Sequence, residues 1–482
     1  MKPPFISTGS VFLAQLFEVH KNSPALKTRD GISTFGDVYD RLQNVTASLK
    51  KAGVQPGNRV ALHMENSELH LYLFLASWIM NFLFIPLDFK APLQALPDIA
   101  EMDFLLTPGD VPTSLPMPII PTEGLMAGHA AAAGRRSRHA VPFRREASAV
   151  FTSGSTGRPR AVVHTVGNYI YSALGTNAFI GLETSDRWLL SLPLFHVGGI
   201  LIWVRTLLAG CMCIIPDNLK NLELSIRNHR PTVLSLVPTQ LIRLLHSEPT
   251  VDILRSAKTI LLGGAPAPPW LIEKALDRGI PIMPTYGSTE SCAQVTAVVK
   301  GAAKAAYLTA GSALPYREIR TAGDGTILLG GKTIFKRYLH DHKTGVSRKG
   351  GFFRTADAGC FDSDGNLVVL GRKDGMFISG GENIHPFEIE NRLLNAGNIA
   401  VAIVVPVFHS EYGAVPWAFV ECEGIFDEAE ILTALKNRLP AYKVPKRIIR
   451  LEPEQGRGGL KYSRKALAEM AGEMAAKERY RR

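Results

Sequence analysis

The residues from Thr152 to Arg160 combine the side chains that a polyphosphate-binding loop needs. These nine residues contain four hydroxyls, two glycines and two arginines. Glycine lets the backbone turn and bring its N–H groups close to an anion. Hydroxyls donate to phosphate oxygens and ligate Mg²⁺, and arginine adds a permanent planar cation. Composition alone leaves a flexible loop as an equal alternative. The candidate phosphate ligands are Thr152, Ser153, Gly154, Ser155, Thr156, Gly157 and Arg160.

The order of these residues narrows the kind of nucleotide site. No Gly-Lys-Ser or Gly-Lys-Thr follows the glycines, and strand-like apolar runs lie on both sides, which excludes the G-x-x-x-x-G-K-[ST] loop. The pattern T-S-G-S-T-G-x-P-[KR] instead resembles the phosphate loop of the adenylate-forming superfamily. That superfamily contains acyl-CoA synthetases, amino-acid adenylation domains and luciferases. It usually has lysine where this chain has Arg160, which keeps the charge and changes its geometry.

The segment 286–290, Y-G-S-T-E, is a second signature. Taken alone it is an ordinary turn after a strand, but its place downstream of the loop matches the superfamily's adenine and metal segment. The resemblance implies that Tyr286 and Gly287 bind the nucleotide, with Tyr286 stacked near adenine. It also implies that Thr289 contacts the α-phosphate and that Glu290 holds Mg²⁺, with Thr152 as a second candidate metal ligand. A hard carboxylate oxygen suits Mg²⁺.

Further nucleotide contacts follow from the same resemblance. Gly264 and Ala265, just after a predicted strand, match the loop that packs against adenine. Asp357, in F-R-T-A-D, matches the carboxylate that accepts both ribose hydroxyls, although an isolated aspartate after a strand is more often a cap or a surface charge. A carboxylate can accept two charge-assisted hydrogen bonds from a cis-diol. Arg372 matches a residue that reaches the ribose or the phosphates.

The resemblance assigns the remaining motifs to two steps of catalysis. Asp374 matches the hinge about which a C-terminal domain swings. Gly380 and Gly381, in S-G-G-E-N-I-H-P, match the loop that lines the pantetheine tunnel of coenzyme A. Lys461, three residues before Arg464, matches the lysine used for adenylation, although Leu460 replaces the usual preceding glycine. A lysine there stabilises the charge that develops when a carboxylate attacks the α-phosphate; a lone lysine in a basic tail is more often a solvated charge.

The identity of the acid depends on other segments. Residues 192–199, 203–205, 235–245 and 458–467 resemble the o-succinylbenzoate–CoA ligases, a branch of the superfamily that acts in menaquinone biosynthesis. The resemblance covers most of residues 30–470 and is strongest from 150 to 295. It implies an ATP-dependent acid–CoA ligase with Mg²⁺ and coenzyme A. An aryl- or fatty-acid–CoA ligase is the alternative within the class, and a non-catalytic nucleotide-binding protein is a remote one.

o-Succinylbenzoate has two carboxylates, and only the succinyl one is activated. The other needs a cation or hydrogen-bond donors, since a buried unpaired charge is costly. Arg205 lies in an otherwise apolar segment and is the candidate partner, with a helix-surface residue or a structural ion pair as alternatives. His196 matches the gate of the acid pocket and is counted with the catalytic residues, while Gln240 and Gln294 are weaker polar candidates. Gly198 stands where related sequences often have serine.

The elements that must position these residues alternate between strands and helices up to about residue 323, which predicts parallel sheets covered by helices. From there, short strands separated by Asp-Gly turns predict a smaller β subdomain. The predicted strands are 60–64, 84–87, 104–106, 188–192, 212–215, 233–237 and 259–262, and the predicted helices include 35–52, 69–80 and 239–246.

The segment G-R-K-D-G at 371–375 is the predicted hinge between two domains. The prediction is an α/β fold with an ATP- and acid-binding domain at 1–371, made of two helix-covered sheets and the β subdomain, and a mobile α+β lid domain at 372–482. In the lid we expect helices at 386–394 and 428–437, strands at 399–405 and 415–420, and a basic tail. Residues 117–138 are expected to form a surface excursion.

Composition and charge limit which cellular compartment and which binding partners we expect for this protein. The longest uncharged run, 71–87, contains Ser77, Asn81 and Pro86 and is short for a bilayer, so we expect a buried helix running into a strand. No signal peptide or C-terminal targeting tripeptide is evident, and five scattered cysteines fit a reducing cytoplasm. The net charge of +11 suits two polyanions, ATP and coenzyme A, and no nucleic-acid motif accompanies it. A homodimer or larger homo-oligomer is left open.

Overall fold

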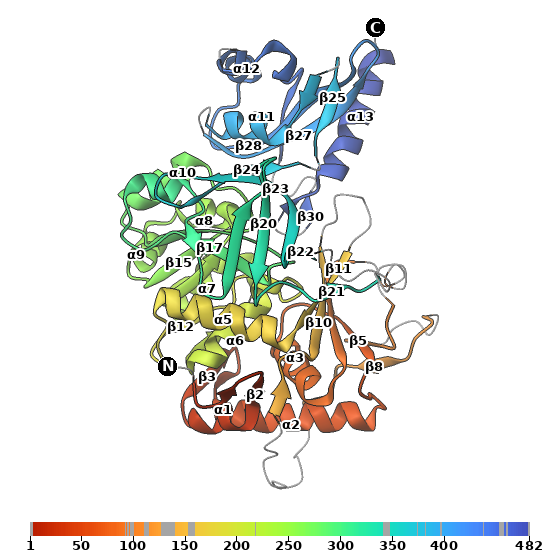
Figure 1. Ribbon diagram of the computed structural model, residues 1–482, viewed down its shortest axis with the longest axis vertical. Coiled ribbons are helices and arrows are strands. Elements are labelled where there is room, and N and C mark those ends of the chain that lie inside the picture. Colours follow the sequence, from red (N-terminus) through yellow and green to blue (C-terminus); the bar gives the residue numbers. More distant parts are fainter. Residues whose placement is uncertain are drawn as a thin grey trace.

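The computed structural model describes residues 3–91, 93, 96, 101–109, 115–126, 140–152, 160–216, 218–340, 348–373, 375–380, 382–395, 398–436, 438–452, 457–458 and 461–480. Two large sheets with helices between them form the body of the molecule, and a β subdomain separates them from the C-terminal elements (Figure 1). This is the predicted α/β architecture.

The first large sheet carries the phosphate loop. Its seven strands run in the order β21-β11-β10-β6-β5-β7-β8. The β5-β6, β5-β7, β7-β8 and β6-β10 pairs are parallel, whereas β11 is antiparallel to both β10 and β21. The strands are β5 (Arg59–His63), β6 (Leu83–Leu87), β7 (Phe104–Thr107), β8 (Ile119–Pro121), β10 (Glu146–Thr152), β11 (Arg160–Thr165) and β21 (Arg337–Tyr338).

The second large sheet is mostly parallel and has nine strands in the order β18-β17-β16-β15-β14-β12-β13-β3-β4. Two of its strands come from the start of the chain, far from the rest in sequence. The strands are β3 (Pro24–Thr28), β4 (Gly31–Thr34), β12 (Arg187–Leu189), β13 (Met212–Ile214), β14 (Val233–Leu236), β15 (Thr259–Leu262), β16 (Ile282–Ser288), β17 (Ala293–Ala297) and β18 (Ser312–Ala313).

The helices α3 (Glu68–Met80), α5 (Val166–Ile180) and α6 (Val197–Ala209) share one hydrophobic core with strands of both large sheets. Nearly every side chain of α3 and α6 is buried, which is the pattern of a helix covered on all sides. The uncharged run at 71–87 is therefore a buried helix followed by a core strand, as predicted. In the part of the chain that is described, no helix is long and apolar enough to cross a membrane.

The outer helices cover the other faces. α7 (Leu222–His229), α8 (Pro238–Leu244), α9 (Glu248–Arg255) and α10 (Pro269–Asp277) form a second core with β12, β14 and β15. α1 (Leu13–Val19) and α2 (Phe35–Lys51) join the first core beside a small sheet of β1 (Ile6–Ser7), β2 (Ser10–Phe12) and β9 (Ala140–Pro142). A capping box between Thr34 and Asp37 begins α2 close to its predicted start.

The β subdomain follows the second large sheet, as the Asp-Gly turns predicted. β19 (Arg317–Thr321), β20 (Thr326–Gly331), β22 (Arg348–Lys349), β23 (Phe352–Phe361) and β24 (Leu367–Arg372) pair antiparallel. Helix α11 (Pro386–Leu394) packs beside β24 at the C-terminal end of this layer (Figure 1).

The C-terminal elements lie at the end of the molecule opposite α1 and α2 (Figure 1). One sheet holds β27 (Ile399–His409), β28 (Gly413–Cys422) and β29 (Ile448–Arg450), and β25 (Phe377–Ser379) pairs with β26 (Glu382–Ile384). α12 (Glu428–Lys436) covers this sheet together with α11. Trp270 Nε1 donates to the Ile399 carbonyl at 3.0 Å, which connects α10 to β27.

One expectation was wrong, and one helix was not expected. Residues 119–121, expected in a surface excursion, form β8 and extend the first sheet, because the partly buried Ile119 and buried Ile120 continue the apolar edge beside β7. The expected basic tail contains helix α13 (Arg464–Tyr480), whose Leu467, Ala471 and Ala475 are buried against the C-terminal sheet. The spacing of these apolar residues by four positions is typical of a helix, but the many charged residues of the segment made the pattern hard to recognise.

Candidate active site

The hairpin of β10 and β11 holds the two ends of the predicted phosphate loop. Thr152 and Arg160 are partners across the hairpin, and the Thr152 hydroxyl donates to the Arg160 carbonyl at 3.3 Å. Strands on both sides agree with the exclusion of a strand–loop–helix nucleotide motif. The intervening candidates lie outside the described residues, so their phosphate contacts stay a prediction: Ser153, Gly154, Ser155, Thr156 and Gly157.

The turn after β16 carries Thr289 and Glu290 and is hydrogen-bonded to β11 and to the segment just before β21. His164 Nε2 lies 2.7 Å from the Thr289 carbonyl oxygen, and the Phe335 N–H donates to the Glu290 carbonyl at 2.9 Å. Burial lowers the pKa of His164 to about 4, so the ring is neutral at pH 7. Nε2 therefore carries the ring proton and donates it to the carbonyl. No motif pointed to His164.

The Glu290 side chain also has a fixed neighbour. The Tyr338 hydroxyl donates to Glu290 Oε1 at 3.3 Å, and the Arg160 guanidinium carbon lies 5.6 Å from the centre of the Tyr338 ring. Burial and the Glu290 carboxylate raise the pKa of Tyr338 to about 12, so the phenol keeps its proton. The Glu290 carboxylate and the Thr152 hydroxyl are hard oxygen donors, which suit Mg²⁺. The residues present therefore fit the predicted metal.

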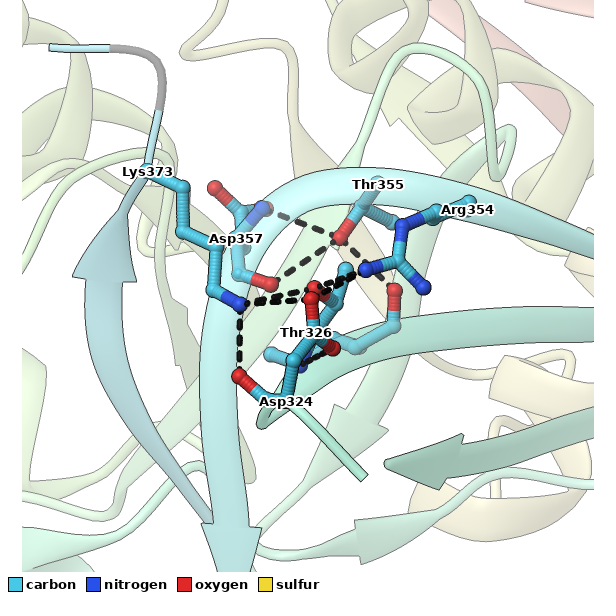
Figure 2. Close-up of polar contacts among 7 residues, drawn as sticks. Asp324, Thr326, Arg354, Thr355, Asp357 and Lys373 are labelled. Atoms are coloured by element: carbon cyan, nitrogen blue, oxygen red, sulfur yellow. Dashed lines mark hydrogen bonds and ion pairs between the residues drawn. The ribbon is translucent and has the colours of Figure 1, made fainter. Parts of the chain in front are cut away.

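Tyr286 and Asp357 meet although they are far apart in the chain. The Tyr286 hydroxyl donates to Asp357 Oδ2 at 2.6 Å, and burial together with Asp357 raises the pKa of Tyr286. The Thr355 hydroxyl accepts from the Asp357 N–H at 3.0 Å and donates to the Ile327 carbonyl at 2.9 Å, which fixes the backbone of β23 at this point (Figure 2). Arg372 is the partner of Asp357 across β23 and β24. Three predicted nucleotide residues thus lie together.

Glycines bring the strands of this site into close contact. A Cβ on Gly287 would lie 2.0 Å from the Ala293 carbonyl oxygen, so no other residue fits between β16 and β17 there. Gly264 has a φ of +81°, which glycine adopts without strain, and Ala265 follows it in the loop after β15. The absence of a side chain at Gly264 leaves the backbone accessible at the position where the resemblance places adenine.

A polar cluster precedes the predicted hinge. Lys373 Nζ donates to the Asp324 carbonyl at 2.6 Å and to the Thr326 hydroxyl at 2.9 Å, and it lies 3.1 Å from Asp324 Oδ2. Arg354 contacts the same carboxylate and donates to the Thr326 hydroxyl at 2.9 Å (Figure 2). The Thr326 N–H and the Lys373 ammonium hold the pKa of Asp324 well below its usual range. Lys373 is therefore fixed to the β subdomain.

The C-terminal candidates are partly described. Gly380 has a φ of +57°, and its N–H donates to the Tyr412 carbonyl at 2.9 Å, which holds the predicted pantetheine loop against the β27–β28 hairpin. The backbone of Lys461 lies in β31 (Lys461–Tyr462), paired with β30 (Arg457–Gly458). Asp374, Gly381 and the Lys461 side chain lie outside the described residues.

Arg205 is buried, with 2% of its surface exposed, which rules out a place on the helix surface. Its guanidinium carbon lies 5.3 Å from the centre of the Trp188 ring. Nε and Nη2 are buried without a hydrogen-bond partner, and among the described residues no carboxylate forms an ion pair with it. Burial and the nearby Arg317 lower the pKa of Arg205 to about 9. Arg205 is thus a buried cation without a counter-ion in the part of the chain that the structure describes.

The other acid-pocket candidates are engaged in hydrogen bonds or lie at the helix start. Gln240 Oε1 accepts from the Val237 N–H at 3.0 Å, and its Nε2 donates to the Ser191 carbonyl at 3.1 Å. Gln294 Oε1 accepts from the Thr176 hydroxyl at 3.3 Å. His196 is exposed at the start of α6. Their contacts with an acid stay predictions.

The fold and these clusters define a nucleotide-binding enzyme, and comparison with known proteins identifies its family. The family described as "AMP-binding enzyme" matches residues 13–339, and "AMP-binding enzyme C-terminal domain" matches residues 388–456. The chain belongs to the AMP-binding enzyme family.

Similar proteins carry a common name. The 2-succinylbenzoate–CoA ligase of Listeria monocytogenes is 35% identical over 64% of this chain and 66% of its own length. The ligase of that name from Bacillus thuringiensis is 30% identical over 93% of this chain and 96% of its own length. The chain thus aligns with slightly less than two thirds of the first relative and nearly all of the second.

Solved structures are similar over almost the whole chain. A variant of E. coli MenE with bound OSB-AMS has a TM-score of 0.84 and 28% identity, and covers 97% of this chain and 100% of its own. The Bacillus subtilis o-succinylbenzoate CoA synthetase (MenE), in complex with the acyl-adenylate intermediate OSB-AMP, has a TM-score of 0.79 and 28% identity, covering 92% of this chain and 94% of its own.

Proposed function

We propose that this protein is an AMP-forming acid–CoA ligase that adenylates the succinyl carboxylate of o-succinylbenzoate and transfers the acyl group to coenzyme A, a step of menaquinone biosynthesis. Membership of the AMP-binding enzyme family supports the reaction class, and relatives named 2-succinylbenzoate–CoA ligase support the acid. A related structure contains the acyl-adenylate of the same acid.

One observation carries the choice of acid, namely the buried and uncompensated Arg205 guanidinium. Burying a cation without a partner is costly, so a fold retains one where a ligand supplies the partner. o-Succinylbenzoate has a ring carboxylate that takes no part in the chemistry and needs a counter-charge. A planar guanidinium suits a carboxylate, and the Trp188 ring beside it suits an aromatic acid.

The nucleotide is held by residues of β16 and β23, of the loop after β15 and of the phosphate loop. Asp357 accepts the ribose hydroxyls, and the Tyr286 hydroxyl, which donates to it at 2.6 Å, fixes the orientation of that carboxylate. Gly264, Ala265 and Gly287 let adenine approach the backbone, and the role of the predicted phosphate loop is to bind the β- and γ-phosphates. Glu290 and Thr152 would hold Mg²⁺, which would neutralise charge on the phosphates.

Adenylation brings two anions together. The succinyl carboxylate oxygen forms a bond to the α-phosphorus, the bond from that phosphorus to the bridging oxygen breaks, and pyrophosphate leaves. Lys461 places an ammonium between the carboxylate and the α-phosphate, and the Thr289 hydroxyl donates to the α-phosphate, so both stabilise the developing charge. His164, 2.7 Å from the Thr289 carbonyl, holds that residue in place.

Thioester formation follows at the same carbonyl carbon. The thiol sulfur of coenzyme A attacks it, the bond to the AMP oxygen breaks, and AMP leaves with the electron pair while the thiol proton passes to the surroundings. We infer that the lid at 372–482 turns about Asp374 between these steps, exchanging Lys461 for the loop of Gly380 and Gly381. The contacts of Lys373 with Asp324 attach residue 373 to the β subdomain, which supports a pivot of the lid directly after this residue.

The compartment and the assembly are part of the same proposal. All five cysteines are free, which suits the cytoplasm, where ATP and coenzyme A are available. The enzyme requires no nucleic acid, and a homodimer or larger homo-oligomer is compatible with the reaction.

An acid panel tests the proposal. Purified protein is given Mg·ATP and single acids, namely o-succinylbenzoate, benzoates and fatty acids, and pyrophosphate release is measured. Thioester formation with coenzyme A is then followed by mass spectrometry. We expect release with o-succinylbenzoate and its conversion to the thioester. Release with benzoates or fatty acids alone would refute the choice of acid, and no release with any acid would refute the enzyme class.

A further inference from the structure

Tyr338, like His164, is a residue of this site that no sequence motif indicated. It lies in β21, at the edge of the first large sheet and more than a hundred and seventy residues after β11, to which it pairs. The backbone fixes its position on both sides, since the Lys336 N–H donates to the Val163 carbonyl at 2.9 Å and the Leu339 N–H donates to the Ala161 carbonyl at 2.8 Å.

Side chains reinforce the same strand. Arg337, next to Tyr338, contacts both carboxylate oxygens of Glu146, with Nε at 3.0 Å from Oε1 and Nη2 at 2.9 Å from Oε2. The Tyr338 ring packs at 4.7 Å, centre to centre, against Phe335. An aromatic side chain that packs on a second ring, and whose strand is fixed by backbone pairing and by the ion pair of its neighbour, is well suited to orient other groups.

Two groups assigned to the nucleotide contact this one tyrosine. Its hydroxyl donates to Glu290 Oε1 at 3.3 Å, and its ring lies 5.6 Å from the Arg160 guanidinium carbon. The hydrogen bond uses one carboxylate oxygen and sets the direction of the other. The Glu290 backbone is fixed by the same segment, through the bond from the Phe335 N–H at 2.9 Å.

The ring contact gives a reason for arginine at position 160. A guanidinium is flat and lies favourably on an aromatic face, whereas a lysine ammonium is a compact point charge that cannot stack in this way. Arg160 is the first described residue after the phosphate loop, so the ring restrains the cation at the loop's end.

We propose that Tyr338 is a positioning residue, which orients the Glu290 carboxylate toward Mg²⁺ and holds the Arg160 guanidinium beside the phosphates of ATP. The inference rests on the proposed function, since it requires that Mg·ATP binds here. It assigns no chemistry to the phenol itself; the effect of Tyr338 is to reduce the freedom of two groups before the nucleotide arrives.

Binding measurements test this without turnover. ATP affinity is measured by titration calorimetry with Mg²⁺ and with EDTA, for wild type and Tyr338→Phe, which keeps the ring and loses the hydroxyl. We expect the strengthening of ATP binding by Mg²⁺ to fall about tenfold in Tyr338→Phe, because a hydrogen bond to a charged group is lost, while affinity in EDTA stays unchanged. In a Glu290→Gln background the same substitution should have little effect.

Two further variants separate the roles. Arg160→Lys keeps the charge and loses the stacking, so it should weaken ATP binding both with and without Mg²⁺. Tyr307→Phe is the matched control, since it loses a hydroxyl that accepts from the Gly301 N–H at 3.1 Å, away from the nucleotide residues. It should alter the melting temperature at most and leave the Mg²⁺ effect unchanged.

The outcomes distinguish this inference from the proposed function. If wild-type protein binds Mg·ATP and Tyr338→Phe retains the full Mg²⁺ effect, with only a lower melting temperature, Tyr338 has a structural role and the inference is wrong. If wild-type protein does not bind ATP at all, the proposed function fails and the inference fails with it.

Discussion

Replacing Arg205 by methionine should separate recognition of the acid from the stability of the fold. Methionine keeps an apolar stem of similar length and removes the charge. A guanidinium with a pKa of about 9, against an ordinary value of 12.5, corresponds to a cost on the order of 5 kcal/mol for keeping the cation charged at neutral pH. The contact with the Trp188 ring stabilises the cation by about 0.5–2 kcal/mol and offsets part of this cost. The unliganded variant should therefore melt at or above the wild-type temperature.

Activity should change in the opposite direction. A hydrogen bond to a charged group is worth about 1.5–3 kcal/mol, so kcat/KM for o-succinylbenzoate should fall about 10- to 150-fold in Arg205→Met. The control substrate is 4-oxo-4-phenylbutanoate, which lacks the ring carboxylate, and its kcat/KM should change little. The KM for ATP should also stay constant, because the described neighbours of the Arg205 guanidinium are Trp188, Arg317 and Cys292, and none of them is a nucleotide candidate.

The pH dependence of the same reaction gives an independent check. The Arg205 cation is present below its pKa of about 9 and is lost as the pH rises through that value. kcat/KM reports the free enzyme, so with o-succinylbenzoate it should fall above about pH 9, and with the control substrate the fall should be smaller. Since the unfolded chain keeps this proton up to about pH 12.5, the unfolded state binds more protons than the folded state between these two pH values. The free-energy penalty that the buried Arg205 charge imposes on the folded state therefore decreases as the pH rises from about 9 to about 12.5.

Arg317→Met is the matched variant for a structural arginine. Arg317 is also buried, but its guanidinium donates to the carbonyls of Gln294, Pro315 and Ser172 and to the Ser172 hydroxyl, at 2.8–3.0 Å. Its loss leaves buried acceptors unsatisfied and should lower the melting temperature clearly. If Arg205→Met behaves like Arg317→Met, with a lower melting temperature and an equal loss for both acids, the reasoning about Arg205 is refuted.

Other substitutions address the nucleotide and the hinge. Lys461→Ala should abolish acid-dependent pyrophosphate release and largely spare thioester formation from the preformed adenylate; equal loss of both steps would contradict its role. Tyr286→Phe removes the 2.6 Å bond to Asp357 and should raise the KM for ATP about tenfold, measured in steady state, with kcat little changed; an unchanged KM would count against it. Lys373→Met should alter the ratio of the two half-reaction rates, whereas Arg354→Met, which loses contacts to the same Asp324, should not; the same effect in both would show a stability role only.

The short-range patterns predicted most elements to within a few residues. Apolar runs such as 259–262 form strands because a buried strand needs only a few consecutive apolar side chains. Capping residues at 34 and 37 begin a helix near its predicted start. α13 was missed because its charged residues conceal a narrow apolar stripe, and β8 was missed because an edge strand of three residues carries too little pattern.

Sequence alone predicted the nucleotide chemistry of this protein, because its short motifs resemble those of the adenylate-forming superfamily and the family match agrees with that resemblance. Tertiary structure decided which distant side chains meet. Tyr286 reaches Asp357 and Tyr338 reaches Glu290 only because strands of different sheets converge there. The burial of Arg205 could not be predicted from the sequence either, since a lone arginine in an apolar helix lies at the surface or in the core according to what packs around it. Spacing along a chain records local conformation, whereas burial and pairing depend on the packing of the whole fold.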